Sequence, residues 1–150
     1  MVKKTKALKY YEAVGRRKES VARVRLYITA KDNTAAIADQ TVKAGEILVN
    51  NALIDRLYPL NADKMRYMLP LTLTNAADRF AVSIRVSGGG KKGQLDAIMH
   101  GLSRALVLVD EENKSLLKTQ GLMTRDSRKK ERRKVGTGGK ARRQKQSPKR

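Results

Sequence analysis

The sequence of 150 residues contains no cysteine, no tryptophan, one histidine and one phenylalanine. Without cysteine, the chain has no disulfide, no thiolate-ligated zinc or iron–sulfur cluster and no thiol nucleophile. A single histidine also excludes a metal site built on a histidine pair within the chain. A secreted disulfide scaffold is therefore excluded, and a reducing compartment fits the composition better.

Long apolar runs are also missing. The longest apolar stretch lies near residues 105–109, whereas a membrane-spanning helix needs about 20 residues. The first six residues are basic, but no apolar segment follows them as in a signal peptide. We expect no membrane partner and a cytoplasmic protein, with the plastid stroma as the alternative location.

Acidic residues are scarce. The chain has 34 Lys and Arg against 14 Asp and Glu, a formal net charge of +20. Residues 125–150 hold 13 of these cations and two acids, a charge of +11, and the other 21 cations and 12 acids give residues 1–124 a charge of +9. A chain this basic favours a polyanionic partner and argues against a small-molecule enzyme.

Residues 125–150 have the composition of a segment that does not fold alone. Val135 and Ala141 are their only clearly apolar residues, and their like charges repel one another. We expect an extended basic tail that becomes ordered on a polyanion, since arginine side chains fork onto phosphate. A merely solubilising tail is the alternative. The predicted division is a globular domain over residues 1–124 and a tail over 125–150.

The first 124 residues predict an α+β domain. Residues 21–28 and 80–86 alternate apolar and polar side chains with period two, which predicts two half-buried strands. In the first of these, Arg23 and Arg25 lie on the outer face. Weaker extended segments are expected at residues 35–39, 47–49 and 71–74.

The longest predicted helix covers residues 95–109, where apolar positions recur at helical spacing. Shorter helices are expected at residues 51–57 and 63–69, because Pro59 and Pro70 follow them and proline disfavours a helical residue before it. A further helical turn is expected at residues 115–118.

A glycine-rich loop joins the second strong strand to the longest helix; it consists of Gly88, Gly89, Gly90, Lys91, Lys92 and Gly93. Its spacing matches G-x-G-x-x-G, but the acids at 110–112 end the helix, whereas the acid of a dinucleotide site ends a following strand. Gln94 stands where a P-loop needs lysine. We predict instead that the glycines let the backbone approach a phosphate while the lysines neutralise its charge. A plain turn with positive φ is the alternative.

A second basic cluster, Arg16, Arg17 and Lys18, precedes the strand that carries Arg23 and Arg25. We expect a basic stripe along one face of the sheet and the loop that leads into it. Phosphate contact is the functional interpretation, and a solvated charged face is the alternative. The two tyrosines just before this cluster do not form the aromatic pair of an RNA-recognition sheet.

His100 lies one helical turn from both Asp96 and Arg104. A catalytic base would need a nucleophile, and no nucleophile-elbow pattern surrounds Ser83 or Ser103. We expect His100 to be a residue of the polar helix face, close to phosphate. The acids of residues 32–78 are scattered singly and lack the spacing of a metal loop. The sequence therefore predicts no catalytic residue, no metal site and no cofactor.

Three motifs resemble those of the bacterial-type small-subunit ribosomal protein nine (S-nine) family, in the family's order. Residues 15–24 are similar to its opening strand, residues 88–106 to its central signature, and residues 117–134 and 140–150 to its tail. The resemblance covers nearly the whole chain. In one departure from the family pattern, the residues before the final Lys149-Arg150 include no aromatic side chain.

The resemblance implies an α+β fold of the ribosomal S-five domain-two-like type and a structural, non-enzymatic role in the head of the small subunit. Small-subunit ribosomal RNA, neighbouring head proteins and the peptidyl-site tRNA are the implied partners during translation. A free basic nucleic-acid-binding regulator is the alternative.

The residues expected to contact ribosomal RNA are basic side chains of both parts of the chain. They are Arg16, Arg17, Lys18, Arg23, Arg25, Lys91, Lys92, Arg104, Arg125, Arg128, Lys129, Lys130, Arg132, Arg133, Lys134, Lys140, Arg142 and Arg143. The resemblance assigns tRNA contact to Lys149 and Arg150, and close backbone approach to phosphate is expected at Gly88, Gly89, Gly90 and Gly93.

Overall fold

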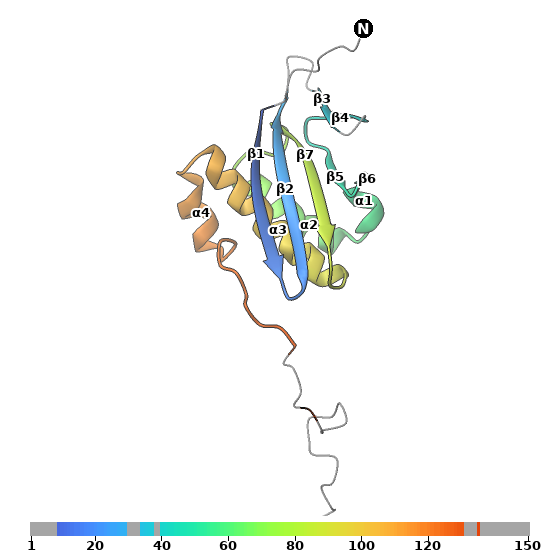
Figure 1. The fold of residues 1–150 in the computed structure, drawn as a ribbon. Coiled ribbons are helices and arrows are strands. Elements are labelled where there is room, and N and C mark those ends of the chain that lie inside the picture. The colour runs from blue at the N-terminus through green and yellow to red at the C-terminus, as the bar shows by residue number, and fades with distance from the viewer. Residues whose placement is uncertain (1–8, 30–33, 38–39, 131–134, 136–150) are drawn as a thin grey trace, which may run out of the picture.

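The computed structural model describes residues 9–29, 34–37, 40–130 and 135. Their main sheet has five strands in the order β1-β2-β7-β5-β6 (Figure 1). The strands are β1 (Tyr10–Arg17), β2 (Ser20–Ile28), β7 (Phe80–Ser87), β5 (Ile47–Val49) and β6 (Ala52–Leu53). β7 pairs antiparallel with β2 and parallel with β5, so the sheet is mixed and the α+β prediction is confirmed.

Helices α2 (Asn61–Leu73) and α3 (Lys91–Val109) cover one face of the sheet and lie behind it in Figure 1. The shorter helices are α1 (Ile54–Leu57) and α4 (Asn113–Thr119). Alternate residues of β2, Val24 among them, are fully buried against the apolar stripe of α3 that includes Leu102. The two strong strands and the longest helix are thus confirmed.

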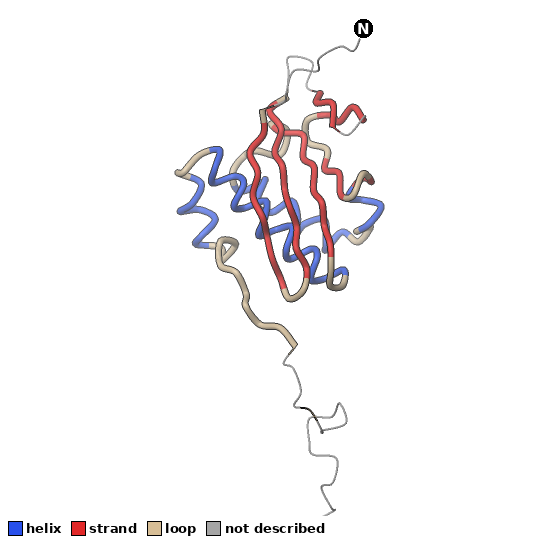
Figure 2. Tube along the Cα trace, in the orientation of Figure 1, coloured by secondary structure: helices blue, strands red, loops and turns tan. Residues whose placement is uncertain are grey.

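A short hairpin packs against the other face of the sheet at one end. It consists of β3 (Thr34–Ile37) and β4 (Gln40–Lys43) and lies at the upper end of the main sheet in Figure 2. Its apolar side chains form a second small core with Tyr27, Leu48 and Ala81 of the sheet. The lower half of this face is left uncovered among the described residues.

The N-terminal strand β1 differs from the prediction of a loop that leads into β2. Gly15, Arg16 and Arg17 belong to β1 itself, which pairs with β2 along its full length. Only Lys18 and Glu19 form the turn, where Lys18 has φ +51°. The adjacent tyrosines and the glycine interrupt the alternation of apolar and polar side chains along β1. Its extended conformation therefore depends on pairing with β2.

Helix α2 also differs from the prediction, because it does not end at Pro70. It continues to Leu73, so residues 71–74 are not extended. Pro70 and Leu71 are buried, and the Thr72 and Thr74 hydroxyls donate to the carbonyls of Met68 and Pro70 at 3.1 and 3.0 Å. Burial of the helix face outweighs the hydrogen bond that proline removes.

The remaining boundaries shift locally. The helix expected at 51–57 is replaced by strand β6 and helix α1. Strand β4 was not predicted, because its alternation of apolar and polar side chains is too short. The longest helix begins at Lys91, so the lysines of the glycine loop form its first turn. The turn expected at 115–118 is confirmed within α4, and the weak strands at 35–39 and 47–49 correspond to β3 and β5.

Strand β1 crosses helix α3 at a pair of glycines. A methyl group added at Gly15 would overlap the Ala97 carbonyl and lie 2.8 Å from the Cα of Gly101, and one added at Gly101 would lie 2.7 Å from Val24. Real side chains do not approach this closely. Glycine is needed at both positions because the two backbones touch.

We expect Gly15→Ala to lower the free energy of unfolding by about 3 kcal/mol or more, since backbone must move to admit the methyl group. Gly90→Ser is the matched control, because Gly90 has open space around its Cα, and its effect should stay within about 0.5 kcal/mol. Denaturant unfolding measures both. Equal midpoints for Gly15→Ala and the unsubstituted chain would contradict the close crossing.

Candidate nucleic-acid interface

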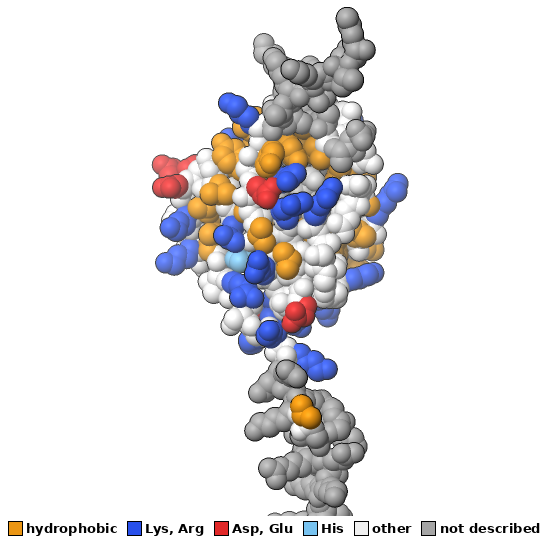
Figure 3. All heavy atoms as spheres, in the orientation of Figure 1, with side chains coloured by type: hydrophobic (Ala, Val, Ile, Leu, Met, Phe, Trp, Pro, Cys, Tyr) orange, Lys and Arg blue, Asp and Glu red, His pale blue; other side chains and the backbone are white. Residues whose placement is uncertain are grey.

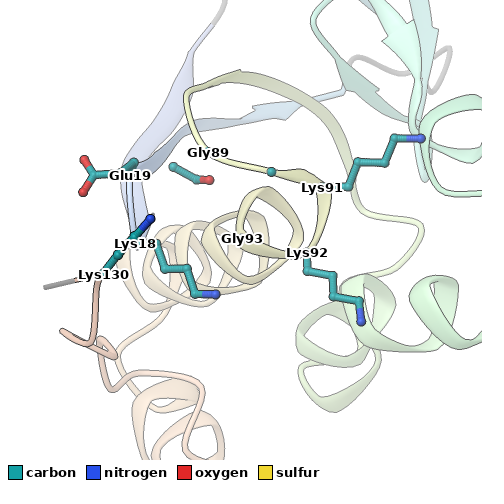
Figure 4. A pocket seen from close by; sticks show the side chains of 9 residues that line it. Lys18, Glu19, Gly89, Lys91, Lys92, Gly93 and Lys130 are labelled. Carbon is teal, nitrogen blue, oxygen red and sulfur yellow. The ribbon is translucent and has the colours of Figure 1, made fainter. Parts of the chain in front are cut away.

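The glycine loop forms one wall of a cavity of about 460 Å³, which we call the lysine cradle. Its lining residues are Lys18, Glu19, Ser20, Gly89, Gly90, Lys91, Lys92, Gly93 and Lys130. They come from the β1–β2 turn, the first residue of β2, the β7–α3 loop, the first turn of α3 and the segment after α4. Figure 4 shows Lys18 and Lys130 on one side of the loop and Lys91 and Lys92 on the other, with the Glu19 carboxylate directed away from α3.

Two of the four glycines in this loop, Gly88 and Gly89, are required by contacts inside the protein, and Gly93 is tightly packed. Gly88 and Gly89 have φ values of +74° and +62°, and side chains there would overlap the Glu19 carbonyl and the Ser20 hydroxyl. At Gly93 a methyl group would lie 3.1 Å from the same hydroxyl. Only at Gly90 would an added side chain meet open space, while Gly88, Gly89 and Gly90 are all exposed, so phosphate approach to this loop stays a prediction. The turn that requires positive φ is confirmed at 88 and 89.

The first turn of α3 combines like charges. Gly90 is the N-cap residue, no side chain caps the N–H groups of this turn, and no acid lies within it. Lys91 and Lys92 are both exposed. Cations are unfavourable at a helix N-terminus, where the N–H groups already present positive charge. An anion bound here would interact favourably with both the lysines and the N–H groups.

Several predicted RNA-binding arginines have partners inside the protein. Arg25 lies 2.6 Å from the Glu12 carboxylate and 4.8 Å from the centre of the Tyr10 ring. This bond to Glu12 raises the pKa of Arg25. Arg104 donates to the carbonyl of Val14. These arginines join elements to one another, so their guanidinium groups are already partly used.

Arg17 is the most enclosed of these arginines, with a side chain only 16% exposed. It lies 3.6 Å from Asp96 and 3.0 Å from Asp126. Eight other predicted cations within residues 9–130 form no ion pair with a described acid. These are Arg16, Lys18, Arg23, Lys91, Lys92, Arg125, Lys129 and Lys130.

The uncovered half of the sheet carries a further cation, Arg85, that was not among the predicted site residues. It lies directly opposite Arg23 in the register of β2 and β7, an arrangement that costs stability because like charges face each other. Figure 3 shows Lys and Arg side chains gathered over this face of the molecule. The sequence could have indicated Arg85, because its place in the period-two pattern of β7 puts it on the outward face.

Comparison with known proteins agrees with this arrangement of charge. The family model described as ribosomal protein S9/S16 matches residues 15–150. This chain belongs to that family. It is also 42% identical over 127 residues to the small ribosomal subunit protein uS9 of Maridesulfovibrio salexigens, an alignment that covers 85% of this chain and 87% of the relative.

Membership of the S9/S16 family confirms the predicted resemblance. It makes the chain a structural, non-enzymatic protein of the small ribosomal subunit. A nucleotide-using enzyme is therefore excluded as the function of the glycine loop. In the described part of the chain, α3 is followed by helix α4 where a dinucleotide site would need a strand.

Neither metal binding nor membrane insertion is indicated by the described residues. Among them, no group of three or more His, Cys, Asp or Glu side chains is close enough to hold a metal ion. None of their helices has the length and apolar composition needed to span a membrane.

The predicted cations nearest the C-terminus lie outside the described residues. They are Arg132, Arg133, Lys134, Lys140, Arg142, Arg143, Lys149 and Arg150. Their RNA and tRNA contacts stay predictions. Within the described part, Arg125, Arg128, Lys129 and Lys130 are exposed.

In this family member, His100 has a structural position at the edge of the sheet. Its Nδ1 accepts a hydrogen bond from the N–H of Arg16 at 3.3 Å. Burial lowers the pKa of His100, the charges of Arg104 and Arg125 lower it further, and a hydrogen bond to the Met123 backbone opposes them. The imidazole is therefore neutral at pH 7 and completes the hydrogen bonding of β1.

We expect the free energy of unfolding to fall as the pH drops from 7.5 to 5.5. The folded state lowers the pKa of His100 below the usual 6.5, so the stabilisation is present above pH 6.5 and is lost as the imidazole gains a proton. Urea unfolding at several pH values measures this slope. Because the chain has one histidine, His100→Gln should flatten it, and an unchanged slope in that variant would disprove the assignment.

Proposed function

We propose that the folded domain binds ribosomal RNA in the small-subunit head through the lysine cradle. The observation that carries the proposal is the first turn of α3, where Lys91 and Lys92 adjoin uncapped N–H groups and no acid lies within the turn itself. A phosphate group relieves this concentration of positive charge, as backbone N–H groups and lysines do at other phosphate sites.

Lys18 and Lys130 supply the opposite side of the same cavity. Four lysines around one open cavity suit a phosphodiester backbone better than a base edge, because an ammonium group is a point charge without bidentate geometry. Binding is therefore driven by phosphate neutralisation and counterion release and reads little sequence. Arg16, Arg23 and Arg85 extend the basic surface beyond the cradle.

The proposal includes the tail. Twenty residues from 131 to 150 would reach up to about 66 Å if fully extended, at roughly 3.3 Å per residue. That length lets Arg132–Lys134 and Lys140–Arg143 bind ribosomal RNA while Lys149 and Arg150 contact the peptidyl-site tRNA. The family membership supports this path, as does the scarcity of acids in the tail.

The finer fold assignment belongs to the same proposal. The mixed sheet with α2 and α3 on one face supports the ribosomal S-five domain-two-like type that the resemblance implies. The division into a domain of residues 1–124 and a tail of residues 125–150 is supported by the core, because Met123 is the last described residue that packs against it. Neighbouring head proteins are the other proposed partners.

We expect Lys91→Glu combined with Lys92→Glu to weaken binding of a small-subunit head RNA fragment. The slope of log affinity against log salt should become shallower by about 1–2, because fewer phosphates are neutralised. The fold should remain as stable or become slightly more so, since acids are favourable at a helix N-terminus. Filter binding at several salt concentrations and thermal unfolding measure the two effects.

Lys114→Glu combined with Lys118→Glu is the matched control for that experiment. Both lysines are exposed on α4 and outside the cradle, and the change in net charge is the same. An equal loss of affinity in the control would mean that only net charge matters. Unchanged affinity and slope in the Lys91/Lys92 variant would leave the loop as a plain structural turn.

Removal of Lys149 and Arg150 should spare subunit assembly and weaken tRNA in the peptidyl site. One charge-assisted phosphate contact contributes at most roughly 1.5–3 kcal/mol, and a partly solvated contact gives less, so we expect a modest loss of tRNA affinity. The measurement is tRNA dissociation from programmed small subunits. Lys145→Gln is the control within the tail, and equal dissociation rates for the shortened and full chains would refute tRNA contact.

A further inference from the structure

Asp126 is an exception in the most basic part of the chain. It is one of two acids among residues 125–150, and a carboxylate repels the RNA that the surrounding cations attract. Its position in the structure supplies a reason. The Asp126 carboxylate lies 3.0 Å from the guanidinium of Arg17 at the end of β1.

Four charged side chains make up this contact, which we call the clasp: Arg17, Asp96, Asp126 and Arg128. Arg17 lies between the two carboxylates, and its Nη1 donates to the backbone carbonyl of Arg128 at 2.9 Å. Arg128 in turn forks onto Asp126, with its Nη2 2.7 Å from Oδ2 and its Nε 3.1 Å from both oxygens. The clasp contains two cations and two anions, so its net charge is zero. It can therefore hold the tail in place but adds no attraction for phosphate.

The clasp is fixed on the folded domain from both sides. Asp96 of α3 also accepts a hydrogen bond from Arg66 of α2 at 2.6 Å, so α2 and α3 together support Arg17 of β1. On the other side, Leu122 and Met123 pack against the core. The segment from α4 to Arg128 is therefore anchored first by apolar contacts and then by the ion pairs.

The clasp and the lysine cradle share the β1–β2 hairpin. Arg17 belongs to the clasp, and the next residue, Lys18, lines the cradle. On the tail, Arg128 belongs to the clasp, and Lys130, two residues further on, lines the cradle. Neighbouring residues of the hairpin thus share the clasp and the cradle with tail residues that lie two positions apart.

We propose that the clasp holds the first residues of the tail on the domain so that Lys130 completes the lysine cradle. The inference rests on the proposed RNA binding of the cradle and adds the groups that assemble it. A phosphate in the cradle is then held by both domain and tail, which fixes the direction in which the tail continues. Arg17 and Asp126 are positioning residues.

Ionisation of Asp126 is consistent with this role. The hydrogen bonds from Arg128, and the charges of Arg128 and Arg17, hold the pKa of Asp126 well below its usual range. The carboxylate is therefore charged at neutral pH. Because Arg17 is largely enclosed while Arg128 is 85% exposed, Arg17 is the partner that is shielded from solvent.

The Asp126→Asn variant distinguishes positioning of the tail from electrostatic attraction, because the two predict opposite changes in RNA affinity. The change removes a negative charge, so attraction alone predicts tighter binding of a small-subunit head RNA fragment. The clasp predicts weaker binding, by up to about fivefold, since a partly exposed ion pair is worth at most about one kcal/mol. Glu111→Gln is the charge-matched control, because Glu111 is exposed and outside both the clasp and the cradle.

A double-mutant cycle with Lys130→Gln then tests whether the clasp acts through Lys130. Lys130→Gln should weaken binding several-fold in the unsubstituted chain and have little effect in the Asp126→Asn background. Additive effects, or tighter binding by Asp126→Asn, would overturn the proposal. If instead Lys91→Glu with Lys92→Glu leaves RNA affinity unchanged, the proposed function of the cradle fails and not the clasp alone.

A distance measurement tests the clasp without RNA. The chain has no cysteine, so spin labels attach only at the introduced Lys129→Cys and at Thr72→Cys on the exposed side of α2. The intact clasp should give one narrow distance distribution, and Asp126→Asn should broaden it while thermal unfolding stays cooperative. A distribution equally broad in both proteins, or equally narrow in both, would show that the clasp does not hold the tail.

Discussion

The contact between Gly15 of β1 and Gly101 of α3 determines how the strand and the helix lie against each other. With no side chain at either position, the strand and helix backbones approach to contact. The polar face of α3 is then next to the outer edge of β1, where His100 accepts the Arg16 N–H and Arg104 donates to the Val14 carbonyl. An edge strand that is satisfied in this way is protected from pairing with another chain.

The same close crossing organises the electrostatics of the molecule. Asp96 of α3 comes near Arg17 at the end of β1, so that the most enclosed arginine is neutralised internally. Arginines with such partners join elements of the domain, whereas the cradle is lined by lysines without a described acidic partner. The described cations thus fall into a set with acidic partners inside the domain and a set without them, which we propose to meet a polyanion.

The sequence predicted those elements whose hydrophobic period is clear. Strands β2 and β7 and helix α3 follow from local alternation alone, and so does the presence of a basic loop before α3. Strand β1 and the continuation of α2 through Pro70 could not be predicted, because pairing with β2 and burial of Pro70 and Leu71 decide them. Tertiary contacts override local propensity at these positions.

For the site, the sequence predicted which residue types were present but not which would be neutralised. Arg17, Lys18 and Arg25 look alike in one basic stretch, yet the partner of Arg17 lies 109 positions away at Asp126 and that of Arg25 lies on the adjacent strand. Long-range ion pairs leave no local signal. The exception is an isolated acid in a basic segment: because it weakens attraction to RNA, its presence indicates an internal partner. Asp126 fits this reasoning, which accounts for a carboxylate at the second position of the tail that we propose to bind polyanions.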